Sequence, residues 1–306
     1  MDSAMAPSRI LDSHIHLWPG TATTSKHHGW MSEGHFFAKQ HGIQDYLAVA
    51  TPKPWGFIYV ETDRYLPSPT PPLHGTENEA EQEERLENWA QQPLEELRFL
   101  RRIVEDKAQE GDGFQEGDVE LMKGCVIWAP FPLAPALFKT FLRIAEGVAG
   151  PELWRRVVGF RYLLQGKAEG EVKRIVQSEA WIENMTSLAS GREGKGWAFD
   201  VGVDTHRDGL EPLEAVGEMI QEVRRREKAS GSGKAVRFVL SRFEISLIVL
   251  YTPRRCASWP MLPAFSTSAL HLVCCCCCCC GYHALQRVNR HTTSESEATL
   301  QNDVAP

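Results

Sequence analysis

The chain has 306 residues, of which 42% are hydrophobic and 24% are charged, a composition that suits one large globular α/β domain or two small ones. Its formal net charge of -7 argues against a general nucleic-acid binder, which is normally basic. No stretch has the pattern of a membrane span or of a signal peptide. We therefore expect a soluble, cytoplasmic protein with neither a nucleic-acid nor a membrane partner.

Six short segments rich in apolar residues are bounded by turn residues or polar helices, and each predicts a β-strand. Between them, apolar residues recur at helical spacing. Strands that alternate with helices predict a parallel sheet with crossover helices, and so an α/β fold. The predicted strands span residues 10–18, 56–62, 122–129, 157–164, 197–203 and 235–240, and the predicted helices span residues 81–109, 134–147, 171–190 and 212–229.

The first predicted strand, "ILDSHIHLW", carries polar residues inside an apolar run. Because strand side chains alternate, we expect Asp12, His14 and His16 on one face and residues 13, 15 and 17 on the other. Two imidazoles two residues apart can bind one divalent ion at about 2.0–2.1 Å. The alternative is that both histidines form hydrogen bonds at a polar strand end or in the core.

Five segments of the chain resemble strands of the amidohydrolase-related family and follow one another in the same order as in that family. Its members are metal-dependent hydrolases with a TIM barrel. "ILDSHIHLW" resembles the family's first strand, and "GFIYVETDRY" is similar to the second strand of its fungal sugar-lactonase branch. "VVGFRYLLQ", "WAFDVGVD" and "VRFVL" resemble the fourth strand, the fifth strand and the start of the sixth. Together these segments cover residues 8–240.

This resemblance implies a (β/α)8-type barrel that hydrolyses a sugar-derived lactone. His14 and His16 would hold a divalent metal ion, zinc by preference, at the mouth of the barrel. The ion would polarise the lactone carbonyl or lower the pKa of bound water toward 7. Two alternatives are a nonoxidative decarboxylase of the same superfamily, acting on an aromatic or muconate-like acid, and a barrel fragment without catalysis.

Five further residues are candidates for the site. Arg161 offers a rigid fork of donors for a substrate oxygen, or it pairs with a carboxylate inside the barrel. Glu61 orients a ligand or pairs with a nearby arginine, Arg64 being the expected one. Asp200 or Asp204 would move the proton as general base, although Asp204 also suits a helix N-cap. Trp18 packs at the barrel mouth or forms an aromatic wall for a sugar ring.

The composition changes near residue 241. Residues 241–306 contain nine charged residues and no lysine, whereas the whole chain has 33 Lys and Arg and 40 Asp and Glu. The family's sixth strand usually continues into Asp-His and then Lys-Pro, but here "FVL" is followed by Ser241 and Arg242. The seventh and eighth strands, with the eighth-strand aspartate, have no counterpart. Seven consecutive cysteines at residues 274–280 lack the spacing of a zinc site or of a disulfide framework.

We therefore expect an incomplete barrel of about six βα units over residues 1–240. Residues 241–306 are expected to form an aberrant, largely disordered low-complexity tail without complete seventh and eighth strands. A catalytic zinc normally has three protein ligands, and the tail lacks the sixth-strand histidine. The chain as written is thus expected to show little or no lactonase activity.

Overall fold

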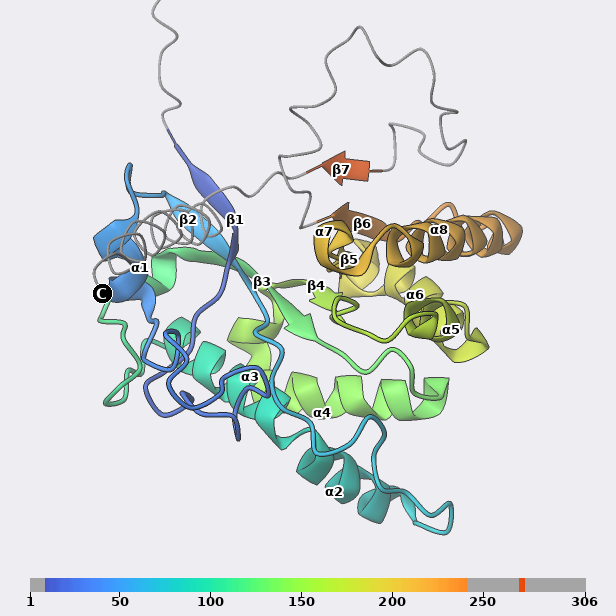
Figure 1. The fold of residues 1–306 in the computed structure, drawn as a ribbon, viewed down its shortest axis with the longest axis horizontal. Coiled ribbons are helices and arrows are strands. Elements are labelled where there is room, and N and C mark those ends of the chain that lie inside the picture. The colour runs from blue at the N-terminus through green and yellow to red at the C-terminus, as the bar shows by residue number, and fades with distance from the viewer. Residues whose placement is uncertain (1–8, 241–269, 273–306) are drawn as a thin grey trace, which may run out of the picture. The chain divides into compact units, whose positions relative to one another are not determined.

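The computed structural model describes residues 9–240 and 270–272, which belong to one unit of the chain. Seven strands form one parallel sheet in chain order, each hydrogen-bonded to the next along the sequence. The sheet curls into a half-barrel, with helices on its outer side (Figure 1). The prediction of an α/β fold with parallel strands is confirmed. The strands are β1 (Leu11–Ile15), β2 (Gly56–Val60), β3 (Met122–Trp128), β4 (Val157–Arg161), β5 (Ala198–Val201), β6 (Arg237–Leu240) and β7 (Leu270–Leu272).

Eight α-helices lie within the described residues, and two predicted helices are each divided in two. The helix expected over residues 81–109 breaks at Ala90, three residues before Pro93, which has no backbone N–H to continue the hydrogen-bond ladder. The helix expected over residues 171–190 breaks before Ser178, whose hydroxyl caps the next helix by accepting from Trp181 N. The helices are α1 (Ile43–Val49), α2 (Glu79–Trp89), α3 (Gln91–Val104), α4 (Pro135–Trp154), α5 (Glu171–Val176), α6 (Glu179–Ser187), α7 (Thr205–Asp208) and α8 (Glu211–Ser230).

Alternate residues of the strands face two different environments. On β2, Phe57 and Tyr59 are 0% exposed and belong to the hydrophobic core that the helices cover. Phe57 packs against Tyr46 of α1, and Tyr59 donates a hydrogen bond to Glu96 of α3. Ile58, between them, lines a pocket on the inner face of the sheet. The helices therefore bury one face of the sheet, and the other face forms the inside of the half-barrel.

β7 was not predicted from the sequence. Its three residues pair in parallel with β6, with Phe238 opposite Leu270 and Leu240 opposite Leu272. The sequence predicts no complete seventh and eighth strands in the tail, and β7 is a single strand of three residues, which was missed because sheet pairing needs a neighbouring strand edge rather than a long local pattern. The rest of the predicted tail, residues 241–269 and 273–306, lies outside the described residues.

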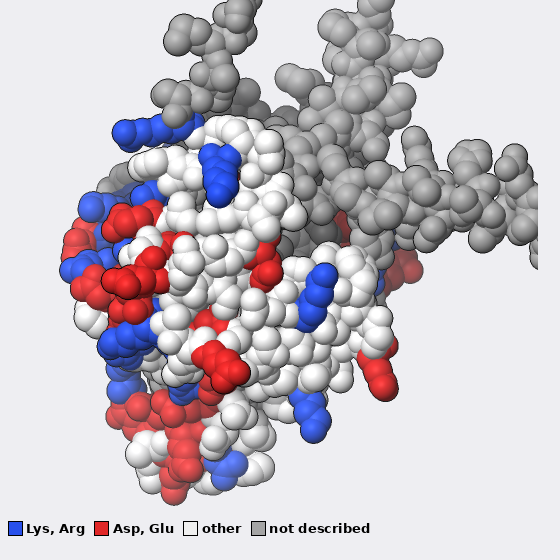
Figure 2. Space-filling view, turned by 90° about the vertical axis from the view of Figure 1, so that its left-hand side faces the viewer, with Lys and Arg blue, Asp and Glu red and all other residues white. Residues whose placement is uncertain are grey.

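The surface mixes charges of both signs. Figure 2 shows acidic and basic side chains interspersed along one margin of the face turned to the viewer, with few charged side chains over its middle. The described residues therefore form no continuous basic patch on this face. No helix within residues 9–240 is long and apolar enough to cross a membrane.

Candidate functional site

The backbone of β1 contains a β-bulge. Asp12 pairs with Phe57 and Ile15 with Tyr59, so three steps along β1 match two steps along β2. Opposed residues in a parallel pair point to the same face, and Phe57 and Tyr59 face the helices. Asp12 and Ile15 therefore also face the helices, although simple alternation would put them on opposite faces.

The bulge changes which polar residues of β1 lie together. The Tyr46 hydroxyl of α1 donates to the Asp12 carboxylate at 2.9 Å. The expectation that Asp12 shares a face with His14 and His16 is thus wrong, since the extra residue of the bulge moves Asp12 to the helix side. Ser13, expected on the apolar face, lines the inner pocket together with His14.

His14 and His16 converge at the carboxyl end of β1, which is the point of the half-barrel where active sites of such folds lie. Their Nε2 atoms are 3.1 Å apart, and the two rings are nearly perpendicular. Nδ1 of His16 lies 2.8 Å from the Val60 carbonyl oxygen. Nδ1 of His14 lies 3.9 Å from the carboxylate of Asp200 on β5. Each imidazole therefore has an acceptor near its Nδ1 and the other imidazole at its Nε2.

These contacts restrict where the protons lie. A carbonyl oxygen only accepts, so Nδ1 of His16 carries the hydrogen and Nε2 of His16 is an acceptor. Nε2 of His14 then either donates a hydrogen to it or shares a bound cation with it.

The geometry fits a divalent metal ion in part. Two ligand atoms on a tetrahedral zinc with bonds of 2.0–2.1 Å are about 3.3–3.4 Å apart, close to the 3.1 Å observed here. A carbonyl and a carboxylate near Nδ1 are the partners that orient metal-binding histidines. Within residues 9–240, however, no group of three or more His, Cys, Asp or Glu is placed to hold a metal. His14 and His16 could thus supply at most two nitrogen ligands to a metal ion.

Arg161 and Glu61 form a buried ion pair between β4 and the end of β2. Arg161 Nε donates to Glu61 Oε1 at 2.5 Å, and its Nη2 donates to the Glu61 carbonyl. Both residues are buried, at 6% and 0% exposed. Of the alternatives left open by the sequence, Arg161 therefore adopts the pairing with a carboxylate, and Glu61 pairs with Arg161 rather than with Arg64. Arg64 lies 3.5 Å from the Glu96 carboxylate.

Burial and charge act in opposite directions on this pair. Burial raises the pKa of Glu61 to about 7, against the lowering effect of Arg161 and with the support of the Glu96 and Asp63 charges. Burial lowers the pKa of Arg161, but Glu61 and Asp200 outweigh it, so the pKa of Arg161 lies above its ordinary value. Asp200 is the register neighbour of Arg161 in the sheet and is 3% exposed. Arg161 therefore supplies positive charge to both carboxylates.

Glu96 of α3 was missed in the sequence, although it organises the end of β2. Its carboxylate accepts from the Tyr59 hydroxyl at 2.7 Å, from Thr62 N at 2.9 Å and from Thr62 Oγ1 at 2.5 Å. A signal was present: Glu96 precedes Phe99, Leu100 and Ile103 at the i+3, i+4 and i+7 positions of the buried face. A carboxylate in line with an apolar stripe indicates a buried polar network.

Two of the predicted site residues, Trp18 and Asp204, do not join the cluster formed by the histidines of β1 and Asp200. Trp18 is 5% exposed, donates its Nε1–H to the Lys39 carbonyl at 2.7 Å and packs among the aromatic rings of the loop after β1. Asp204 caps α7, accepting from the backbone N–H of His206 and Arg207. Neither lines the inner pocket. Asp204 thus has the N-cap contacts that the sequence left open as an alternative.

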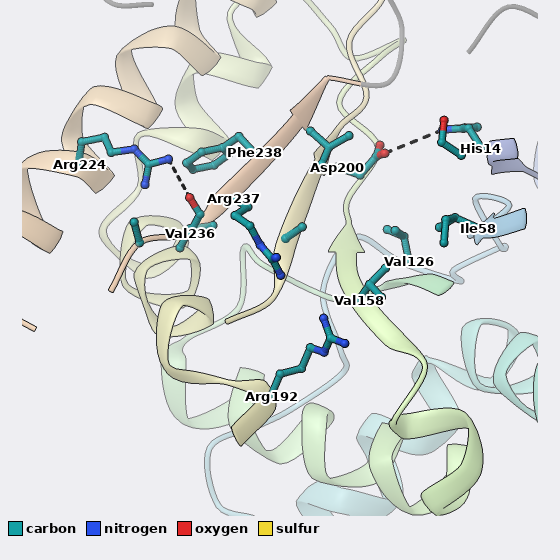
Figure 3. Close-up of a pocket in the computed structure, with 14 residues that line it drawn as sticks. His14, Ile58, Val126, Val158, Arg192, Asp200, Arg224, Val236, Arg237 and Phe238 are labelled. Carbon is teal, nitrogen blue, oxygen red and sulfur yellow. Dashed lines mark hydrogen bonds and ion pairs between the residues drawn. The ribbon is translucent and has the colours of Figure 1, made fainter. Parts of the chain in front are cut away.

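The inner pocket connects His14 and Asp200 with the rest of the half-barrel. It has a volume of about 720 Å³, within the usual range of ligand pockets. Figure 3 shows His14 and Asp200 at one end, facing each other, and three arginines at the other. Most of the remaining lining is apolar and comes from β2 to β6.

Comparisons with known proteins add no assignment, since no family model, no curated protein and no solved structure matches the chain. The family resemblance of the sequence therefore stays a prediction.

Proposed function

We propose that the chain is a metal-dependent hydrolase of lactones, built on part of a (β/α)8-type barrel and acting in the cytoplasm on a sugar-derived lactone. The observation that carries the proposal is the 3.1 Å approach of the His14 and His16 Nε2 atoms beside Asp200. A divalent ion bound to the two imidazoles would polarise the lactone carbonyl and lower the pKa of bound water. His14 and His16 would hold the ion, each oriented by the acceptor near its Nδ1.

Asp200 is the residue best placed to move the proton. It lies beside His14 and next to Arg161 in the sheet, whose positive charge favours the ionised carboxylate. As general base, Asp200 takes the proton from the attacking water while the water oxygen adds to the lactone carbonyl carbon. The ring C–O bond then breaks, and the released alkoxide takes the proton back, which gives the hydroxy acid. One water is consumed for each bond broken.

Glu61 and Arg161 support this centre rather than reach the reacting atoms. The ion pair uses Nε and Nη2 of Arg161 and fixes the guanidinium beside Asp200. The family resemblance implies that Arg161 contacts a substrate oxygen directly. Such a contact would need an N–H group of Arg161 that the ion pair with Glu61 does not use.

Metal content and turnover test the proposal separately. The full-length chain, loaded with zinc and desalted, is expected to retain zinc, and His16→Ala is expected to lose it. Asp200→Asn is expected to retain zinc but to lose hydrolysis of aldonolactones. His206→Ala, an exposed histidine of α7, is the matched control and should change neither.

Two results would overturn the proposal: zinc retention unaffected by His16→Ala, or equal turnover by Asp200→Asn and the unchanged chain. Zinc retained at His14 and His16 without any hydrolysis would favour the second candidate, a barrel without catalysis. The finding of two rather than three protein ligands among the described residues is what favours that candidate.

A further inference from the structure

The inner face of the half-barrel is apolar along most of its length. Ile58 on β2, Val126 on β3, Val158 on β4 and Ala198 on β5 line the pocket, one from each of four neighbouring strands. Gly124 lets two of these side chains pack closely over the strand, because a Cβ at this position would lie 2.9 Å from Val158 Cγ1 and 3.2 Å from Ile58 Cδ1. Such a surface takes the hydrocarbon part of a ligand and leaves recognition to the few polar groups at its ends.

The end of the pocket away from His14 is cationic. Arg192, Arg224 and Arg237 border it, and Asp200 is the one carboxylate among the described residues of the lining. Arg237 is opposite Ala198 in the sheet, two residues before Asp200. Two residues of a strand span about 6.6 Å, so Arg237 and Asp200 lie at different levels of the same inner face.

Two of these guanidinium groups keep donors for a ligand. Arg224 pairs with Glu227 at 2.6 Å and donates to the Val236 carbonyl at 2.7 Å, so it is held on the helix side. Arg237 donates from Nη2 to the Gly196 carbonyl at 3.0 Å, which uses one of its five N–H groups. Arg192 has no ion pair with a carboxylate within the described residues. In Figure 3 the side chains of Arg192 and Arg237 extend toward each other at this end of the pocket.

We infer that the pocket binds a carboxylate with an unbranched apolar body, such as a medium-chain fatty acid. The carboxylate lies between Arg192 and Arg237, where bidentate, charge-assisted hydrogen bonds match its planar fork. The hydrocarbon chain lies along Ile58, Val126 and Val158. Charge complementarity selects this class of ligand, because an apolar pocket alone does not discriminate an acid from an alcohol. Neither metal nor His16 takes part, so the inference is independent of the proposed function.

Calorimetry on the full-length chain treated with EDTA tests the inference, with octanoate, octanol and butanoate as probes. Octanoate is expected to bind about tenfold or more tightly than octanol, because hydrogen bonds to charged groups favour the acid. Butanoate is expected to bind at least about a hundredfold more weakly than octanoate, since each buried methylene changes affinity about fourfold. The variant His206→Ala, at an exposed position of α7, should bind octanoate as the unchanged chain does.

Variants separate the charge from the apolar surface. The double variant Arg192→Gln and Arg237→Gln should lower octanoate affinity to that of octanol and leave octanol affinity unchanged. Val158→Phe fills the pocket and should weaken both probes. Arg98→Gln, an exposed arginine of α3 that pairs with Glu95, is the control. Equal affinity for octanoate and octanol, no effect of the double variant on octanoate, or no binding of either probe would overturn the inference.

Discussion

At the scale of single residues, Arg161 and Glu61 of the buried ion pair differ in whether they can become neutral when the other is removed. The pKa of Glu61 is already raised to about 7, so Glu61 can take a proton when its cation is lost. An arginine cannot lose its proton in a protein, so Arg161 without Glu61 stays charged and buried. The cost of removing each partner therefore differs.

We expect Glu61→Leu to lower the free energy of unfolding by about 3–5 kcal/mol, the usual cost of a buried unpaired charge. Arg161→Met should cost less, because Glu61 becomes neutral at pH 7. The double variant should cost less than the sum of the two single variants. Urea unfolding at pH 7.5 measures all three, with Arg98→Met at an exposed pair as the control. Additive costs, or a larger cost for Arg161→Met, would contradict this account.

His28 contributes to the pH dependence of stability. It is 0% exposed, and burial together with the Arg64 and His27 charges lowers its pKa to about 3. Nε2 of His28 lies 2.9 Å from Thr62 Oγ1, whose own hydrogen goes to Glu96. His28 is therefore the neutral Nε2–H tautomer, and protonation at Nδ1 is unfavourable in the folded state.

The unfolded chain binds a proton at His28 below its ordinary pKa of 6.5, while the folded protein does not until about pH 3. Stability from this group is thus complete above pH 6.5 and falls as the pH decreases, by about 2 kcal/mol between pH 7.5 and pH 5. His28→Gln keeps a donor for Thr62 and cannot titrate, so its loss of stability over this interval should be smaller by that amount. Urea unfolding at the two pH values measures this difference, and His206→Gln should behave as the unchanged chain. Equal pH dependence of His28→Gln and the unchanged chain would show that His28 is protonated in both states.

At the scale of elements, one side chain ties α6 to the segment after β3. Asn184 is 2% exposed, and its Nδ2 donates to the carbonyls of Phe131 at 3.0 Å and of Leu133 at 2.7 Å. Neither carbonyl belongs to a strand or helix, so the amide replaces the backbone partners that regular structure would provide.

Asn184→Ala should lower the free energy of unfolding by about 2–4 kcal/mol, because it leaves two carbonyls without their amide donor and opens a cavity. Urea unfolding followed by circular dichroism measures the loss. Asn88→Ala, at an exposed position of α2, should change stability little. A loss at Asn184 no larger than at Asn88 would mean that water replaces the amide.

The elements also show what local patterns do and do not determine. The six predicted strands are all present, since short apolar runs between turn residues fix strand positions locally. The breaks at Ala90 and before Ser178 depended on one proline and one cap, and the helical period continues across both. The bulge in β1 left no local signal, because it is defined by the pairing with β2.

At the scale of the whole molecule, the proposed hydrolysis would depend on how many metal ligands the half-barrel supplies. Two imidazoles hold zinc less firmly than the three protein ligands of ordinary catalytic sites. We expect little or no aldonolactone hydrolysis by the chain as written, and any residual turnover should be lost on EDTA treatment and restored by added zinc. A version whose residues after Leu240 are replaced by an Asp-His-x-x-Lys-Pro strand and two further βα units should turn over faster. Comparable turnover of the two proteins in a zinc-supplemented assay would mean that residues after Leu240 already complete the site.

The sequence by itself determined the alternation of strands and helices, and with it the parallel sheet. The two-residue spacing of His14 and His16 also predicted that they point the same way, which the 3.1 Å approach of their Nε2 atoms confirms, although the same rule failed for Asp12 because of the bulge.

Only the tertiary structure decided which partners the polar residues take. It placed Asp12 against Tyr46, paired Arg161 with Glu61, set Glu96 under the end of β2 and brought Asp200 to His14. It also added β7 to the sheet. The physical reason is that the face of a strand to which a side chain points depends on only a few consecutive residues. Contact between strands depends instead on their order and register, which residues far apart in the sequence determine together.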